Sequence, residues 1–452
     1  MKNLENRNKY FFGLGTIGRD AFHAFEANAI LYFLSDVLSL PLWVFATVSM
    51  LLSVLRIVDA INDPITGLVI DNIRSPWGKF KPAILVGGVA SVIFYLMLFG
   101  NIGTGWSFII VFGLAYILWD ISFGINDIGY WTLLPALTQD QKQRERNGAF
   151  SRICASIGCY AIMVGWQPIT SAMGDTPQAW FWVAVVLCVL YLGFLAFTLF
   201  GVKEPRVAPE EQESTTLKQM WKALTGNDQL MWTTLAMALF MVGYCTTVNS
   251  AIYYMKYIFG DEGLYVIMVV ACGASQLGTL AVYPMVAKHF TRRQLYTLAT
   301  VLVIAGYVVF FFAEISLVLI VIGALLVFVG QAFIQTLMLM FLADTVEYGQ
   351  WKLGKRNEAV TFSIQPVVNK IGGALATGLV SLTLIFSGIK TGEQTAEFID
   401  AGGKLLVKLS MFVVPLIFIV VGYIIYLKKY KISEEFYADM LKDLKEKEQV
   451  SE

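Results

Sequence analysis

The chain has 452 residues, of which 57% are hydrophobic and only 15% are charged. Soluble domains carry about 25% charged residues, so this composition indicates a multi-pass membrane protein. The 33 basic residues are balanced by 33 acidic ones, and without a basic excess we expect no nucleic-acid partner. The five cysteines lack metal-ligand spacing, so we expect neither a zinc site nor a disulfide.

Twelve stretches are long and apolar enough to cross a bilayer, which takes about 20 residues. They are expected at residues 11–35, 42–70, 81–100, 106–136, 147–173, 179–202, 229–257, 264–287, 294–313, 316–346, 358–387 and 405–427. The domain boundaries that follow are an N-terminal six-helix bundle over 1–202, a cytoplasmic linker over 203–228, a C-terminal six-helix bundle over 229–427 and a cytoplasmic tail over 428–452. In the tail, Ile432, Phe436, Met440 and Leu444 have helical spacing, which predicts a short amphipathic helix.

Lys and Arg gather in alternate loops, as after 42–70 and before 147–173. Because basic loops stay in the cytoplasm, we expect both termini to be cytoplasmic in a protein of the cell membrane. A short repeat, RNGAFSRI from Arg146 and RNEAVTFSI from Arg356, opens equivalent helices of the two halves. A parallel duplication of six helices is typical of major-facilitator transporters. The predicted fold class is therefore an all-α polytopic membrane protein with twelve transmembrane helices in two six-helix halves, the major facilitator fold.

The expected helix at 42–70 carries RIVDAINDPITG, which places charges inside the membrane. Each charge near the bilayer centre costs about 2.5–3.5 kcal/mol. Arg56, Asp59 and Asp63 share one helix face, Asn62 borders it, and Pro64 leaves a backbone carbonyl without its usual donor. Such a cluster of oxygens suits a hard cation, and the paired carboxylates could instead carry a proton. A buried ion pair with Arg56 would explain one aspartate but not both.

Further ionisable residues lie in the other expected spans. In all, we count six acids (Asp20, Glu26, Asp59, Asp63, Asp120 and Asp127) against four bases (Arg19, Arg56, Arg152 and Lys370). This excess of negative charge favours a site for one or two cations. His23 and Glu26 could form a proton-responsive pair, although we expect His23 to fill the core instead.

Asp127 and Trp131 are one helical turn apart in FGINDIGYWTLLP, so a carboxylate and an indole share a face. This pair suits a sugar, because the carboxylate accepts hydroxyl hydrogen bonds while the ring covers the apolar side of a pyranose. The alternative is a tryptophan of the membrane interface. GLGTIG at 13–18 opens an expected helix without a preceding strand, so we interpret it as close helix packing rather than a dinucleotide site. Nothing in the sequence resembles a catalytic constellation, and we expect no enzyme.

Several motifs together resemble the glycoside–pentoside–hexuronide:cation symporters, a family that includes the melibiose carrier. They are GRD, RIVDAINDPITG, DNIRSPWGKFKP, NDIGYW and ADTVEYGQWKLGKR. The resemblance implies a cation site at Asp59, Asn62 and Asp63. It also implies a sugar site made by Arg19, Asp20, Asp127, Trp131, Arg152, Gln365 and Lys370.

Three positions depart from the family pattern. Gly124 stands where the family has a threonine that adds a hydroxyl to the sodium site, which leaves sodium and protons both open. Gln335 replaces a tryptophan, so one wall of the sugar pocket differs. Ala27 replaces a tyrosine, next to the unusual Glu26.

The sequence therefore predicts symport of a glycoside (an oligosaccharide, pentoside or related sugar) with Na⁺ or H⁺ by alternating access. We expect the sugar and the lipid bilayer as partners, no bound cofactor and no obligate protein partner. Two alternatives are a cation-linked carrier of lysophospholipid-like amphiphiles and a membrane sugar sensor that does not transport. Competition by free sugars distinguishes a glycoside symporter from the first alternative, and uptake into vesicles distinguishes it from the second.

Overall fold

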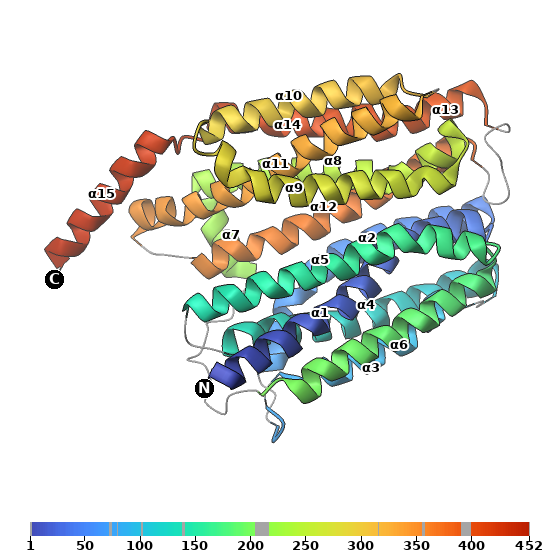
Figure 1. The fold of residues 1–452 in the computed structure, drawn as a ribbon, viewed down its shortest axis with the longest axis horizontal. Coiled ribbons are helices and arrows are strands. Elements are labelled where there is room, and N and C mark those ends of the chain that lie inside the picture. Colours follow the sequence, from blue (N-terminus) through green and yellow to red (C-terminus); the bar gives the residue numbers. More distant parts are fainter. Residues whose placement is uncertain are drawn as a thin grey trace. The chain divides into compact units, whose positions relative to one another are not determined.

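The computed structural model describes residues 2–71, 75–78, 80–100, 103–137, 141–203, 217–314, 316–354, 358–389 and 399–451. The chain divides into two compact units, Met1–Ser214 with Ile389–Gln394, and Thr215–Gly388 with Thr395–Glu452. Within the described ranges every regular element is helical, and the helices of each unit run alongside one another (Figure 1).

The first unit contains six long helices. They are α1 (Lys2–Tyr32, continued by a π-helical turn at Phe33–Val37), α2 (Leu42–Asp71), α3 (Lys81–Leu98), α4 (Gly105–Ala136), α5 (Gln141–Ala172) and α6 (Pro177–Gly201). Helix α1 packs against α5 and α6, while α4 packs against α2 and α3. Residues on α1, α4 and α5 are thereby held in one bundle.

The second unit contains the remaining helices. They are α7 (Leu217–Gly226), α8 (Asp228–Tyr254, with a π-helical turn at Met255–Phe259), a 3-10 turn (Glu262–Leu264), α9 (Tyr265–Val286), α10 (Arg292–Phe311), α11 (Leu317–Leu353), α12 (Glu358–Phe386), α13 (Ala401–Lys408), a π-helical turn (Leu409–Val413), α14 (Val414–Lys429) and α15 (Glu434–Ser451). Helix α8 packs against α12 and α14, and α11 packs against α9 and α10.

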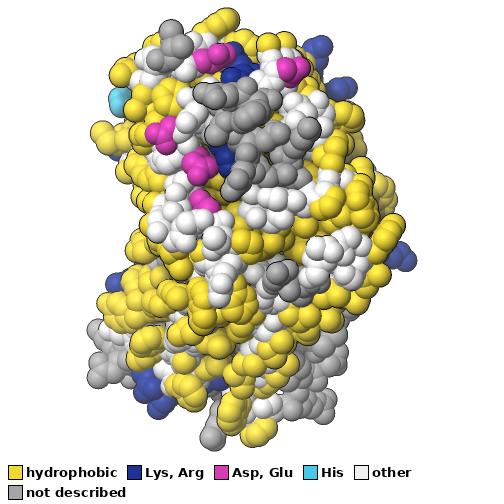
Figure 2. All heavy atoms as spheres, turned by 90° about the vertical axis from the view of Figure 1, so that its right-hand side faces the viewer, with side chains coloured by type: hydrophobic (Ala, Val, Ile, Leu, Met, Phe, Trp, Pro, Cys, Tyr) yellow, Lys and Arg dark blue, Asp and Glu magenta, His cyan; other side chains and the backbone are white. Residues whose placement is uncertain are grey.

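The predicted all-α membrane fold is confirmed. Among the described residues, eleven helical segments are long and apolar enough to span a membrane. The remaining predicted span, 11–35, covers most of α1 and part of the π-helical turn after it, and it contains three charged residues, Arg19, Asp20 and Glu26. At the helix ends that face the viewer in Figure 2, hydrophobic side chains are mixed with acidic and uncharged polar groups. Along the helices, large hydrophobic side chains are exposed. Such a surface is suited to lipid rather than water.

The glycines of GLGTIG pack α1 closely against its neighbours, as the sequence predicts. A Cβ on Gly15 would collide with the hydroxyl groups of Thr198 and Tyr130, and one on Gly13 would collide with the Phe150 ring. Small residues let helix backbones approach closely. This close packing matters in a membrane, because lipid offers helices no hydrophobic drive to associate. The glycines thus bring α1 close to α4, α5 and α6.

The predicted amphipathic tail helix is α15, which begins at Glu434, so Ile432 lies just before it. Ile432 and Met440 are buried against Tyr348 of α11, and Phe436 packs on the same cluster. The Trp351 indole N–H also donates to Asp443 Oδ2 at 3.3 Å. The predicted connector over 203–228 includes α7, a helix that the sequence analysis does not anticipate, and residues 204–216 lie outside the described ranges.

Candidate functional site

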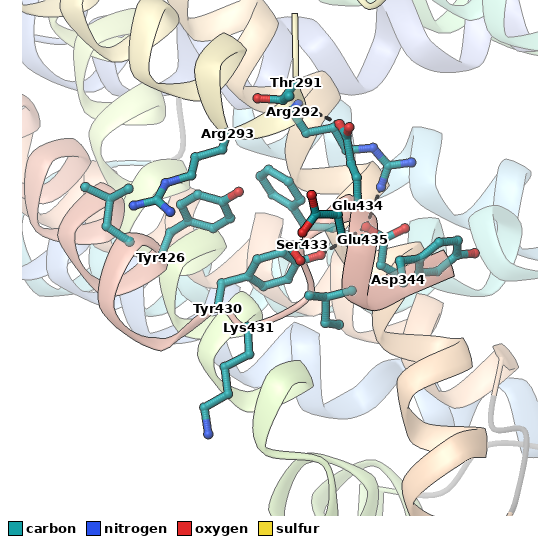
Figure 3. A pocket seen from close by; sticks show the side chains of 14 residues that line it. Thr291, Arg292, Arg293, Asp344, Tyr426, Tyr430, Lys431, Ser433, Glu434 and Glu435 are labelled. Atoms are coloured by element: carbon teal, nitrogen blue, oxygen red, sulfur yellow. Dashed lines mark hydrogen bonds and ion pairs between the residues drawn. The ribbon is translucent and has the colours of Figure 1, made fainter. Parts of the chain in front are cut away.

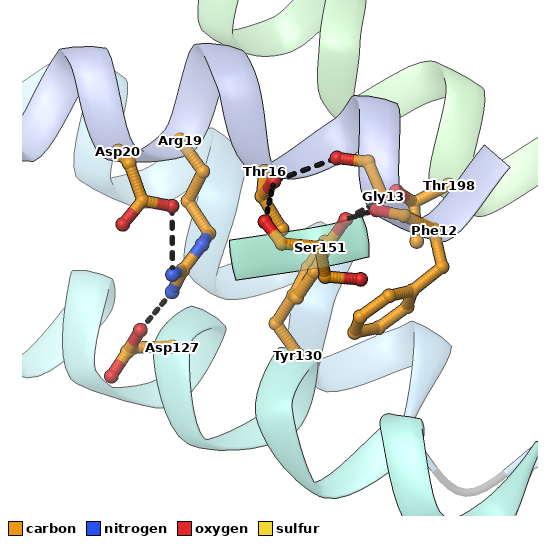
Figure 4. A network of polar contacts seen from close by, with 9 residues as sticks. All are labelled: Phe12, Gly13, Thr16, Arg19, Asp20, Asp127, Tyr130, Ser151 and Thr198. Atoms are coloured by element: carbon orange, nitrogen blue, oxygen red, sulfur yellow. Dashed lines mark hydrogen bonds and ion pairs between the residues drawn. The ribbon is translucent and has the colours of Figure 1, made fainter. Parts of the chain in front are cut away.

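Arg19 is the centre of a charged network in the first unit (Figure 4). Its side chain is only 4% exposed, and it donates to Asp20 Oδ2 at 3.0 Å. It also forms an ion pair with Asp127 of α4. Asp127 remains 39% exposed and Asp20 28% exposed, so both carboxylates keep oxygen atoms that an entering ligand can reach.

Trp131 joins this network through its indole ring. The Arg19 guanidinium lies 5.0 Å from the ring centroid and the Arg152 guanidinium lies 4.9 Å from it. The half-buried indole also makes an edge contact with the Phe12 ring, 6.3 Å away. These contacts place Trp131 inside the first unit, which favours the sugar-facing interpretation over a tryptophan of the membrane interface.

Five of the seven residues expected at a sugar site therefore meet, coming from α1, α4 and α5. Together they offer fixed donors, fixed acceptors and an aromatic face within one small region. Hydrogen bonds to charged groups are roughly twice as strong as those between neutral groups. The aromatic surface complements the apolar side of a sugar ring. Arg19 pairs with Asp20 and Asp127 through its two terminal nitrogens, while its buried Nε has no hydrogen-bond partner among the described residues. A polyhydroxylated ligand could replace part of this network.

The hydrogen bonds that hold this network's helices together are not evident in the sequence. The Tyr130 hydroxyl lies 2.8 Å from Thr198 Oγ1 and donates to the Phe12 carbonyl, while its ring lies 5.1 Å from the Arg19 guanidinium. Thr16 Oγ1 donates to the Ser151 carbonyl at 3.0 Å (Figure 4). These bonds fix α1 against α4, α5 and α6. The only signal in the sequence is that Tyr130 adjoins Trp131.

The expected cation residues all lie on α2. Asp59 is half-buried, whereas the side chains of Asn62 and Asp63 lie outside the described part of the structure. Arg56 forms an ion pair with Glu26 of α1 at 3.0 Å and donates to the Tyr116 hydroxyl at 3.2 Å. Glu26 is thus a counter-charge for Arg56, a partner that the sequence analysis did not identify.

One expectation on α1 is wrong. His23 does not fill the core, because its side chain is exposed. Its ring stacks on that of Phe123 with centroids 5.2 Å apart. The stacking partner lies on α4, and the sequence could not show which helix faces His23.

The remaining expected site residues belong to the second unit. Gln365 and Lys370 are half-buried on α12. Gln335 of α11 accepts a hydrogen bond from Gln276 of α9 at 2.8 Å. On α4 in the first unit, a Cβ built on Gly124 would meet no atom within 4 Å. Close packing therefore does not explain why this position has no side chain.

A cavity of about 430 Å³ lies elsewhere in the second unit, between α10, α11, the end of α14 and the tail (Figure 3). It contains none of the residues expected at the sugar or cation site. Arg292 pairs with Asp344, Tyr430 donates to Asp344 at 3.0 Å, and the Arg292 amide donates to Glu434 at 3.1 Å. These contacts attach the start of α15 to the bundle.

Comparison with known proteins gives a consistent result. The sequence profile described as MFS/sugar transport protein matches residues 11–434. The chain is 33% identical to the lactose permease of Lactobacillus delbrueckii subsp. bulgaricus, over 98% of this chain and 73% of that protein. It is 30% identical to the raffinose carrier protein of Pediococcus pentosaceus, over 96% of this chain and 71% of that protein. The fold is similar to that of the nucleoside transporter NupG, with a TM-score of 0.66 and 14% identity, covering 95% of this chain and all of that one.

Proposed function

This chain belongs to the MFS/sugar transport protein family, and from that premise we propose how it works. It is a multi-pass membrane transporter, a cation-coupled symporter of sugars, and not an enzyme. We propose that it carries a glycoside into the cell with Na⁺ or H⁺, both termini facing the cytoplasm. Neutral oligosaccharides are the first candidates, because the relatives include a lactose permease and a raffinose carrier.

The charged network of the first unit is the observation that supports this proposal. In our assignment Asp127 and Asp20 accept hydrogen bonds from sugar hydroxyls, Arg19 and Arg152 donate to them, and Trp131 covers the sugar ring. A site built to hydrogen-bond hydroxyls rejects analogues that lack them, because its polar groups would then be left unpaired. Gln365 and Lys370 of α12 complete the proposed set.

Coupling would work through α2. We assign the cation to Asp59, Asn62 and Asp63, whose charge and oxygen atoms suit either Na⁺ or a proton. A bound cation raises sugar affinity, and by linkage the sugar raises cation affinity by the same factor. One charge moving through 100 mV releases about 2.3 kcal/mol, enough for roughly fifty-fold accumulation.

The test is uptake by the purified protein in lipid vesicles. Lactose and raffinose are offered under an imposed sodium gradient, an imposed proton gradient, or neither. We expect accumulation with one of the gradients and little without it. Asp59→Asn should abolish accumulation, whereas Asp439→Asn, the same change on the exposed tail helix, should not.

Other outcomes would point elsewhere. Sugar binding without uptake would favour a sensor. Uptake of a lysophospholipid that no free sugar inhibits would favour an amphiphile carrier. Accumulation by Asp59→Asn that equals wild type would remove Asp59 from the cation site.

A further inference from the structure

Three uncharged polar side chains meet in the second unit, one from each of three helices. The Gln276 amide of α9 donates to Gln335 Oε1 of α11 at 2.8 Å and to the Tyr244 hydroxyl of α8 at 3.5 Å. We call Tyr244, Gln276 and Gln335 the amide triad. Its members all belong to the second unit, whereas the charged network around Arg19 belongs to the first. Of the three, only Gln335 stands out in the sequence.

The amide triad lies midway along spans of the membrane, on a partly accessible surface. All three side chains are half-buried, whereas the neighbouring Gly243, Ser275 and Ile334 are buried. Amide groups facing lipid would lose hydrogen bonds to water without replacement, at several kcal/mol per group. Polar surface at this depth is therefore expected to line a water-filled passage.

A second polar cluster of the same unit shows what a purely structural set looks like. Gln331 donates to the Tyr307 hydroxyl at 3.0 Å, and Tyr307 also bonds to Thr247. These three side chains are almost entirely buried. They join α8, α10 and α11 without reaching solvent. The amide triad differs from them in its exposure.

The amide triad has the chemistry of a site for sugar hydroxyls. Gln335 uses its carbonyl oxygen within the triad, and its amide nitrogen makes no hydrogen bond to the described residues. Two amides and a phenol offer both donors and acceptors without a net charge. A carboxylate would lose its hydration beside them without gaining a cation, which is costly.

We propose that the amide triad binds hydroxyl groups of the uncharged part of the transported glycoside, and so selects neutral oligosaccharides over hexuronides. The proposal rests on the proposed function and adds to it three residues that select the neutral substrates.

The experiment measures sugar uptake by vesicles containing Gln276→Leu, Gln335→Leu or Tyr244→Phe. Thr336→Val is the matched control, because the Thr336 hydroxyl bonds only to the Ala332 carbonyl of its own helix among described residues. Each variant is tested for the KM of lactose and of raffinose, for inhibition by methyl β-glucuronide, and for thermal stability in detergent. Gln335→Arg is added as a variant that introduces a cation.

We expect each triad variant to raise the KM for at least one neutral sugar about fivefold, the value of one hydrogen bond of about 1 kcal/mol. Thermal stability and the Thr336→Val control should match wild type. Gln335→Arg should strengthen inhibition by the glucuronide. The proposal is overturned if the KM stays at the wild-type value in all three variants. It is also overturned if the variants lose thermal stability and bind neutral and charged sugars more weakly by the same factor.

The two proposals fail in different ways. If wild type neither transports nor binds any of these sugars, the proposed function itself is wrong. If wild type transports them and Asp127→Asn prevents it, while the triad variants behave as wild type, only the role of the amide triad is wrong.

Discussion

The two units hold polar side chains inside the membrane in contrasting ways. In the first unit, Arg19 is fully enclosed and pairs with Asp20 and Asp127. In the second unit, Gln276 and Gln335 bond without any charge. Removing one partner of a buried ion pair is costly, because the other charge is left buried and unpaired. A hydrogen bond between two neutral amides is weaker, and losing it leaves no unpaired charge. We therefore expect the first unit to contribute most of the sugar affinity and the second to adjust selectivity.

The largest effect is expected for Asp127→Ala. It removes an acceptor for the sugar and leaves the enclosed Arg19 with one carboxylate instead of two. Hydrogen bonds to charged groups contribute about 1.5–3 kcal/mol each, so sugar binding should fall roughly 100-fold. Calorimetric titration of the purified protein with lactose or raffinose measures this. If affinity falls no further than in the triad variants, the contrast between the units is wrong.

Next in size is Trp131→Ala, which removes the ring that contacts both guanidinium groups. We expect a loss of roughly tenfold in sugar affinity, from lost stacking and from freer arginines. Trp131→Phe keeps an aromatic face and should recover part of the loss. Equal affinity in both variants would mean that the aromatic face does not contact the sugar.

A matched pair of tyrosines tests the supports of each unit. Tyr130→Phe removes a buried hydroxyl bonded to Thr198 and Phe12, and Tyr307→Phe removes one bonded to Thr247 and Gln331. Each should lower the free energy of unfolding by about 1–2 kcal/mol, seen as a lower melting temperature. Tyr130→Phe should also raise the sugar KM, because its ring faces Arg19, whereas Tyr307→Phe should not. A shift in KM for Tyr307→Phe alone would reverse this assignment.

The smallest effect is expected for Gly124→Thr. The space beside Gly124 accepts a Cβ without a clash, so the fold should tolerate the change. By the family resemblance, the added hydroxyl should increase the sodium dependence of uptake a few-fold, measured as the sodium concentration for half-maximal rate. An unchanged sodium dependence would separate Gly124 from the cation site.

Much of the fold could be predicted because membrane spans have a strong signal in length and apolarity. The network of Arg19, Asp127 and Trp131 could be proposed because ionisable residues are expensive in a span and stand out there. The partner of Arg56 could not be predicted, because Glu26 lies on another helix. Neither helix sequence shows how α1 and α2 align along their axes.

The roles of uncharged polar residues are harder to predict from sequence. Tyr130 and Tyr244 lie in apolar runs where tyrosines of the core and of a site are indistinguishable in sequence. The contact between Gln276 and Gln335 depends on how α9 and α11 pack, which neither segment shows alone. The exposure of His23 is unpredictable for the same reason, since it depends on which face of α1 meets α4.

The central claim is that the charged network of the first unit binds the transported sugar. Its most direct test is a structure of the protein determined with raffinose or lactose bound. Our account predicts sugar hydroxyls within hydrogen-bonding distance of Asp127 and Arg19, with a sugar ring against Trp131. A sugar bound elsewhere, with the Arg19–Asp127 pair intact and untouched, would contradict it.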